Sequence, residues 1–188
     1  MTVNTGSGTP AGTSSLTVTA SSGTLSHSAG ASLVVTSSPS AFTPIRVNAG
    51  GPAYTDSLGQ VWSTDTGYQQ GTSNSTTAAI SGTSDPTLYQ TEHYSTTGTL
   101  TYQFNVPNGS YTVTLKFAEI WYTSSGQRVF NIQINGTTVQ SNLDIFAAAG
   151  GTNKAYDLSF PVTVSGGQVT IALGAVVGFE KINAIQIR

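Results

Sequence analysis

The chain has 188 residues, of which only 7% are charged, with a formal net charge of −2 and no cysteine. An ordinary globular domain carries about 25% charged residues. So few Lys and Arg residues exclude a nucleic-acid surface or an anionic-lipid surface, because basic side chains supply the affinity for both. The lack of cysteine excludes disulfides and Cys-based zinc sites. No apolar run approaches the roughly 20 residues of a membrane helix, so we expect no membrane insertion.

Ser, Thr, Asn and Gln replace charge as the source of solubility, which is typical of secreted bacterial β-modules. The start, Met1–Gly6, has neither the basic region nor the apolar region of a signal peptide. We therefore expect a piece of a longer exported protein that is secreted or displayed at the cell surface.

The first 40 residues contain short alternating segments. Ser15–Ala20 and Ala31–Thr36 alternate, Gly23–Ser28 between them predicts a turn and a short strand, and Ser37–Ser40 predicts a linker. Three short strands cannot bury an independent core. Residues 1–40 resemble the last strands of a bacterial immunoglobulin-like repeat. Two interpretations stay open: the tail of a neighbouring domain or strands packed on the main body, and an arm that links subunits by strand addition.

The main body predicts an all-β fold, because no window holds a helical period. Asn135-Gly136 is the strongest hairpin signal, since a type I′ turn needs positive φ at both positions. Within residues 109–117 the odd-numbered positions 111 to 117 are apolar and point to one face. We predict an antiparallel β-sandwich of the jelly-roll or galactose-binding type, with extra N-terminal strands. The predicted strands are 45–47, 98–104, 109–117, 128–134, 137–139, 157–164, 168–175 and 183–187.

The charged residues offer little for catalysis. Glu92 and Glu119 are the acids with aromatic neighbours on both sides, and a glycosidase needs two carboxylates in one cleft. The alternative is that both carboxylates bind loop backbone. His27 and His93 lie far apart and form no zinc pattern, and no nucleophile elbow or phosphate loop is present. We predict no catalytic residues, no metal and no cofactor.

Five aromatic residues fall at predicted strand ends or in loops: Tyr68, Tyr89, Tyr94, Trp121 and Tyr122. Adjacent rings on an extended chain point opposite ways, so at least one ring of the pair Trp121–Tyr122 should be exposed. Exposed rings beside polar groups mark a binding surface. Sugars suit it, since their C–H faces stack on rings while their hydroxyls bind amides. The alternative is that the rings merely cover the ends of the sandwich.

Six segments carry a resemblance to a known family. They are IRVNAGGPAYTDSLGQVWSTD (45–65), LYQTEHY (88–94), YTVTLKFAEIWY (111–122), RVFNIQINGTTV (128–139), LDIFAAAGG (143–151) and EKINAIQI (180–187). Residues 43–188 resemble the malectin domain, a carbohydrate-binding module, and residues 1–40 lie outside the resemblance. The resemblance implies a β-sandwich lectin without catalysis that holds a short glucose-containing oligosaccharide.

The resemblance also implies the site residues. Tyr94, Trp121 and Tyr122 match the family's loop aromatics, and Tyr68 is a looser match. Gly178 stands where the family has its sugar-binding acid, which leaves Glu180 as the candidate acid two residues on. The ligand-binding prediction is therefore Tyr68, Tyr94, Trp121, Tyr122 and Glu180.

Two functions follow as hypotheses. The first is non-catalytic binding of a neutral glucan-type glycan, which targets a secreted bacterial protein to its polysaccharide. The second is a structural or adhesive module of a cell-surface or filament protein, assembled through residues 1–40 or joined to neighbouring domains. A glycosidase using Glu92 and Glu119 is a third and weaker hypothesis.

Overall fold

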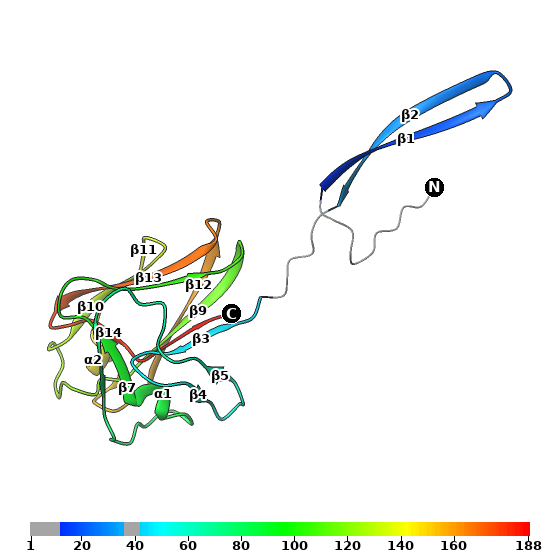
Figure 1. Ribbon diagram of the computed structural model, residues 1–188. Coiled ribbons are helices and arrows are strands. Elements are labelled where there is room, and N and C mark those ends of the chain that lie inside the picture. The colour runs from blue at the N-terminus through cyan, green and yellow to red at the C-terminus, as the bar shows by residue number, and fades with distance from the viewer. Residues whose placement is uncertain (1–11, 36–41) are drawn as a thin grey trace. The chain divides into compact units, whose positions relative to one another are not determined.

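The computed structural model describes residues 12–35 and 42–188. The chain divides into two compact units, residues 1–41 and 42–188, and each is described by itself (Figure 1). The linker predicted at Ser37–Ser40 lies outside the described residues.

The first unit contains one long antiparallel hairpin. Strand β1 (Gly12–Ser22) pairs with β2 (Leu25–Val35) without a register shift, and Gly23 in the turn has φ +61°. The prediction of a separate short strand before residue 31 is wrong. The backbone stays extended through Ala29 and Gly30, so a single strand joins the two predicted segments. In the two strands only Leu16, Leu33 and Val35 are even half-buried.

The second unit is a sandwich of two four-stranded antiparallel sheets, which confirms the predicted fold class (Figure 1). The first sheet has the order β11 (Thr137–Leu143), β10 (Val129–Ile134), β13 (Gln168–Val177), β8 (Leu100–Asn105). The second sheet has the order β12 (Tyr156–Val164), β9 (Gly109–Phe117), β15 (Ala184–Ile187), β3 (Ile45–Asn48).

The main core lies between the two sheets. Alternate residues of β9 are buried, as predicted, from Tyr111 to Phe117. They share one cluster with Phe130 of β10 and Ile171 of β13. The rings of Phe117 and Phe130 are 5.9 Å apart. Alternation on each strand therefore buries one face of each sheet and leaves the other face for solvent.

Shorter elements complete the domain. A three-stranded sheet has the order β14 (Lys181–Ile182), β7 (Thr91–Tyr94), β6 (Thr72–Ser75), and a two-stranded sheet joins β4 (Tyr54–Thr55) and β5 (Val61–Trp62). The short helices are α1 (Thr87–Gln90) and α2 (Ile145–Ala149). Asp144 caps α2 by accepting the Ala147 N–H at 3.0 Å. Among the described residues, no helix has the length and apolarity to cross a bilayer.

Tyr89 is a core residue, which corrects the prediction that it lies with the surface aromatics. It belongs to α1, is 2% exposed, and packs in a second cluster with Trp62 and Leu88. Its hydroxyl donates to Asp157 at 2.7 Å. Burial, followed by the nearby Asp157 carboxylate, raises the pKa of Tyr89 well above its usual value. The ring therefore stabilises the fold and offers no surface to a ligand.

The turn after β3 requires glycine. Gly50 has φ +71°, and a Cβ there would lie 2.1 Å from the carbonyl oxygen of Glu92. The backbone of the loop thus contacts the backbone of β7 directly, which fixes β7 against the sandwich.

Candidate functional site

A pocket of about 160 Å³ lies at the end of the sandwich where the loops meet. We call it the aromatic pocket, and it is lined by Asn74, Glu92, Tyr94, Thr96, Trp121, Tyr122, Arg128 and Phe179. These residues come from β6, from β7 and the loop after it, from the segment between β9 and β10, and from the turn between β13 and β14. Four segments distant in sequence therefore meet at one pocket.

The rings of the pocket are partly open to solvent. Trp121 is 66% exposed and Phe179 is 39% exposed, while Tyr94 and Tyr122 are half-buried. The different exposures of Trp121 and Tyr122 agree with the prediction that at least one ring of the pair would escape the core. Exposed apolar rings around a recess form a surface suited to stacking on a flat apolar face of a ligand.

Glu119 fixes the backbone that presents the pair. Its side chain is fully buried, and its Oε1 accepts the N–H groups of both Trp121 and Tyr122 at 3.0 Å. Charge-assisted hydrogen bonds to backbone N–H are among the stronger ones in proteins. The interpretation of Glu119 as a residue that orders the loop is confirmed.

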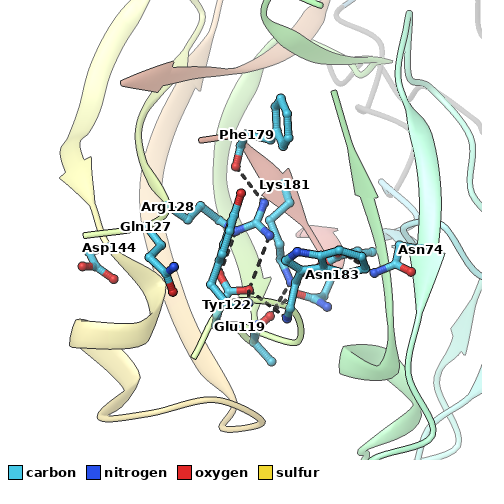
Figure 2. Close-up of polar contacts among 12 residues, drawn as sticks. Asn74, Glu119, Tyr122, Gln127, Arg128, Asp144, Phe179, Lys181 and Asn183 are labelled. Carbon is cyan, nitrogen blue, oxygen red and sulfur yellow. Dashed lines mark hydrogen bonds and ion pairs between the residues drawn. The ribbon is translucent and has the colours of Figure 1, made fainter. Parts of the chain in front are cut away.

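Arg128 joins two walls of the pocket. Its Nε donates to Glu119 Oε2 and its Nη1 donates to the Phe179 carbonyl oxygen, both at 2.7 Å (Figure 2). The Tyr122 ring lies against the guanidinium, with the centroid 4.9 Å from Cζ. One cation therefore links the segment of Trp121 and Tyr122 to the turn that carries Phe179.

A second ion pair lies beside the first. Lys181 Nζ is 2.7 Å from Glu92 Oε2 and also donates to the Ala118 carbonyl oxygen, and Asn74 donates to Glu92 Oε1 at 3.1 Å. Burial opposes ionisation of Glu92, but the attraction of Lys181 and these hydrogen bonds outweigh it and lower the pKa of Glu92. We call Glu92, Lys181, Glu119 and Arg128 the charged floor, whose formal charges cancel.

Tyr68 lines a different pocket, of about 390 Å³, which we call the His93 pocket. Its ring lies 4.3 Å from the His93 ring. Asp65 binds His93 Nδ1 at 2.5 Å and also accepts the Tyr102 hydroxyl at 2.9 Å and the Gly50 N–H at 2.8 Å. These contacts tie His93 into the fold. In residues 12–35 and 42–188, no three metal-ligating side chains gather into a possible metal site.

Glu180 is 1% exposed and does not line the aromatic pocket. Its Oε1 accepts the N–H of Leu100 at 2.9 Å, and it lies beneath a neighbouring hollow. Burial raises the pKa of Glu180 despite the backbone N–H groups that favour its charged form. The carboxylate is therefore directed at the backbone of β8.

Residues 43–186 match the family model described as the Malectin domain. The chain belongs to the malectin family. Human malectin is 37% identical over 90 residues, which cover 46% of this chain and 30% of that protein. The Arabidopsis thaliana protein named Receptor-like protein 4 is 42% identical over 106 residues, covering 53% of this chain and 17% of the relative. The chain spans about a third of the length of the frog malectins that it matches.

Solved structures share the fold. The extracellular domain of ANXUR1 from Arabidopsis thaliana superposes with a TM-score of 0.70 at 22% identity, covering 76% of this chain and 47% of that one. A Bacteroides uniformis β-glucuronidase also has a TM-score of 0.70 at 22% identity, covering 94% of this chain and 22% of the enzyme. At such identities the likeness concerns the fold alone.

Three of the five residues predicted from the malectin resemblance come together in the aromatic pocket: Tyr94, Trp121 and Tyr122. Sequence reasoning missed Asn74, Thr96, Arg128 and Phe179. The sequence contains a signal for Arg128, because this residue is the lone charge in the neutral stretch that follows the aromatic pair. Asn74 had none, because the approach of β6 to β7 is visible only in the fold.

Gly178, which the resemblance aligns with the family's acid, cannot carry a side chain without a shift. Its φ is +67°, and a Cβ there would lie 2.5 Å from the Gln127 carbonyl oxygen and 3.4 Å from the Tyr122 hydroxyl. The neighbouring backbone therefore occupies the space into which an acid would begin to extend. The polar side-chain group nearest to that space is the Tyr122 hydroxyl.

Proposed function

We propose that the second unit is a non-catalytic carbohydrate-binding module whose aromatic pocket takes a neutral, glucose-containing oligosaccharide. The malectin family, to which the chain belongs, comprises carbohydrate-binding domains. The observation that carries the proposal is the convergence of Tyr94, Trp121, Tyr122 and Phe179 around one recess. Tyr68 and Glu180 lie outside that recess, so we do not propose them as contacts of the sugar bound there.

The chemistry of the pocket favours a neutral polyol. Its rings provide faces for sugar C–H groups, and Asn74, Thr96 and the Tyr122 hydroxyl provide donors and acceptors for sugar hydroxyls. The two charged residues that reach the pocket, Glu92 and Arg128, are neutralised by Lys181 and Glu119. A charged ligand would therefore meet no uncompensated charge.

The contacts of the two buried glutamates argue against a glycosidase. A general acid needs a raised pKa, whereas the pKa of Glu92 is lowered. Glu119 accepts two backbone N–H groups and the Arg128 guanidinium, so its lone pairs are occupied. Glu119 holds loop backbone as expected, whereas Glu92 binds the side chains of Asn74 and Lys181 and no loop backbone. Malectin itself is a non-catalytic domain.

The module is proposed to work as part of a longer exported bacterial protein, at the cell surface or secreted. Binding to a polysaccharide would raise the local concentration of the attached domains on that polymer. Extracellular domains of plant receptor-like proteins share the fold, which supports an extracellular setting.

The test is titration of gluco-oligosaccharides by calorimetry. Each ring–sugar stack should contribute about 1 kcal/mol, so Trp121→Ala and Tyr94→Ala should each weaken binding about 5- to 10-fold. Tyr68→Ala is the aromatic control, because its ring lines the His93 pocket, and it should leave the affinity unchanged. Equal losses of affinity in Tyr68→Ala and Trp121→Ala would show that the binding site is not confined to the aromatic pocket. Unchanged affinity in both Trp121→Ala and Tyr94→Ala would refute the site.

The second candidate is a structural or adhesive role for the first unit. The observation in its favour is the hairpin β1–β2, whose side chains are almost all exposed and whose two outer edges lack a partner strand among the described residues. Such edges accept further strands. Deletion of residues 1–38 should abolish any ordered assembly seen by light scattering under this role. A full-length chain that is monomeric at all concentrations would reject it.

A further inference from the structure

A second hollow, of about 330 Å³, adjoins the aromatic pocket. The two share Thr96 and Phe179, so the Phe179 ring forms the ridge between them. The second hollow has Gly98, Gly174 and Gly178 among its walls, which leaves room above the backbone. Glu180 is directed at the Leu100 N–H, so it presents no exposed charge there.

A third hollow, of about 180 Å³, continues from the second. The two share Thr99, Gly174 and Ala175. The third hollow lies on the solvent face of β13 and β10, where Asn131 and Gln133 of β10 form its far side. Shared residues thus connect the aromatic pocket, past Phe179, to the open face of the first sheet. We call the second and third hollows together the sheet groove.

The depth of the sheet groove comes from side-chain size. Positions 172 and 174 of β13 face solvent and hold Ala and Gly, while Asn131 and Gln133 project from the neighbouring β10. The fold does not require glycine at 174. Its φ is not positive, and a Cβ there would meet only the Thr99 hydroxyl, at 3.9 Å. Gly174 keeps open a space that a side chain could fill without a clash.

The sheet groove exposes no charge, since Glu180, the ionisable residue of its lining, is 1% exposed. The strands β8, β10, β11 and β13 contain no Asp, Glu, Lys, Arg or His. The opposite sheet carries Arg46, Lys116 and Asp157. Amides and hydroxyls both donate and accept, which suits sugar hydroxyls. Gln133 holds only a long 3.4 Å hydrogen bond to Thr138 that a ligand hydroxyl could replace.

We propose that a neutral polysaccharide chain places one sugar unit in the aromatic pocket and that the sheet groove binds the units that follow. Continuity through Phe179 and the absence of charge from the four strands carry this inference. It rests on the proposed function and extends it, since it makes the ligand an extended chain. An anionic polymer would find no cation along the groove.

The experiment compares disaccharides with hexasaccharides of α-linked and β-linked glucose by calorimetry. One or two additional net hydrogen bonds should make the hexasaccharide bind about tenfold more tightly than the disaccharide. Gly174→Val should fill the groove and remove that gain while the disaccharide affinity stays unchanged. Valine favours a strand more than glycine does, so the variant should keep its fold.

Thr170→Ile is the matched control, because residue 170 lies on the same face of β13 but outside the groove. It should leave both affinities unchanged. A hexasaccharide gain that persists in Gly174→Val would overturn the groove and leave the proposed function standing. Trp121→Ala, by contrast, should weaken both ligands. If the native protein binds no gluco-oligosaccharide of either length, the groove and the proposed function both fail.

Discussion

The charged floor and the sheet groove lie on either side of Phe179 and differ in their content of charged side chains. The charged floor holds four buried ionised side chains, Glu92, Lys181, Glu119 and Arg128. The four strands of the first sheet hold none. The difference shows where charge is useful in this fold. The Arg128–Glu119 pair holds loop segments and the Lys181–Glu92 pair joins β14 to β7, whereas the first sheet is held by its own ladder.

Buried ion pairs are a demanding way to hold a loop, because each ion loses its hydration. Here the Glu119 carboxylate and the Arg128 guanidinium also bind backbone groups of the loops, at Trp121, Tyr122 and Phe179. A hydrophobic replacement would leave those backbone groups without partners. This explains why loops that present exposed rings rest on charge in an otherwise nearly uncharged chain.

The largest effect should follow from Glu92→Gln. The variant leaves the Lys181 ammonium buried without its counter-charge, which should lower the free energy of unfolding by about 3–5 kcal/mol. Urea unfolding followed by tryptophan fluorescence measures the loss. Asp157→Asn is the matched control, because it removes the carboxylate of the ion pair Lys116–Asp157, which is more exposed than the pair Lys181–Glu92. That change should cost about 0.2–1 kcal/mol. Equal losses in both variants would refute the contrast.

The same variant should change the pH dependence of stability. Because the pKa of Glu92 is lower in the folded state than its usual value of 4.5, its stabilisation is complete above that value. It is lost as the pH falls from 4.5 through the folded-state pKa. Glu92→Gln should therefore flatten the loss of stability in this acid range.

A smaller effect should follow from Gly178→Ala, at the junction of the two regions. The left-handed backbone costs alanine about 1–2 kcal/mol, and contact with the Gln127 carbonyl oxygen adds to it. Gly126→Ala is the matched control, since Gly126 also has positive φ but has open space around it. It should show the backbone cost alone in thermal unfolding. A smaller loss at 178 than at 126 would contradict the close contact.

The sandwich could be predicted from sequence because alternation acts locally. In residues 109–117 the apolar residues at odd-numbered positions correctly identify the buried face of the strand. Hairpin signals such as Asn135-Gly136 likewise place β10 next to β11. The long strand β2 was missed because Gly30 resembles a turn residue, although its pairing with Thr17 keeps it extended.

The site was predictable only in part, because loops place side chains by contacts between distant segments. Trp121 and Tyr122 were found as an aromatic pair in a polar loop. Tyr89 looked similar but lies in the short helix α1, which gives no periodic signal, and Asp157, 68 residues on, binds its hydroxyl. Glu180 looked available, but the N–H of Leu100, 80 residues earlier in the chain, holds it.

The contacts of Glu119 have a consequence for how such a module diversifies. The carboxylate holds the turn through the main chain at residues 121 and 122, so the turn does not depend on the side chain at the exposed position 121. Under the proposed function, exchanging the Trp121 ring can alter glycan preference while the backbone beneath stays in place. Selection, in nature or in the laboratory, can thus vary the recognition surface at this single codon with little penalty in folding.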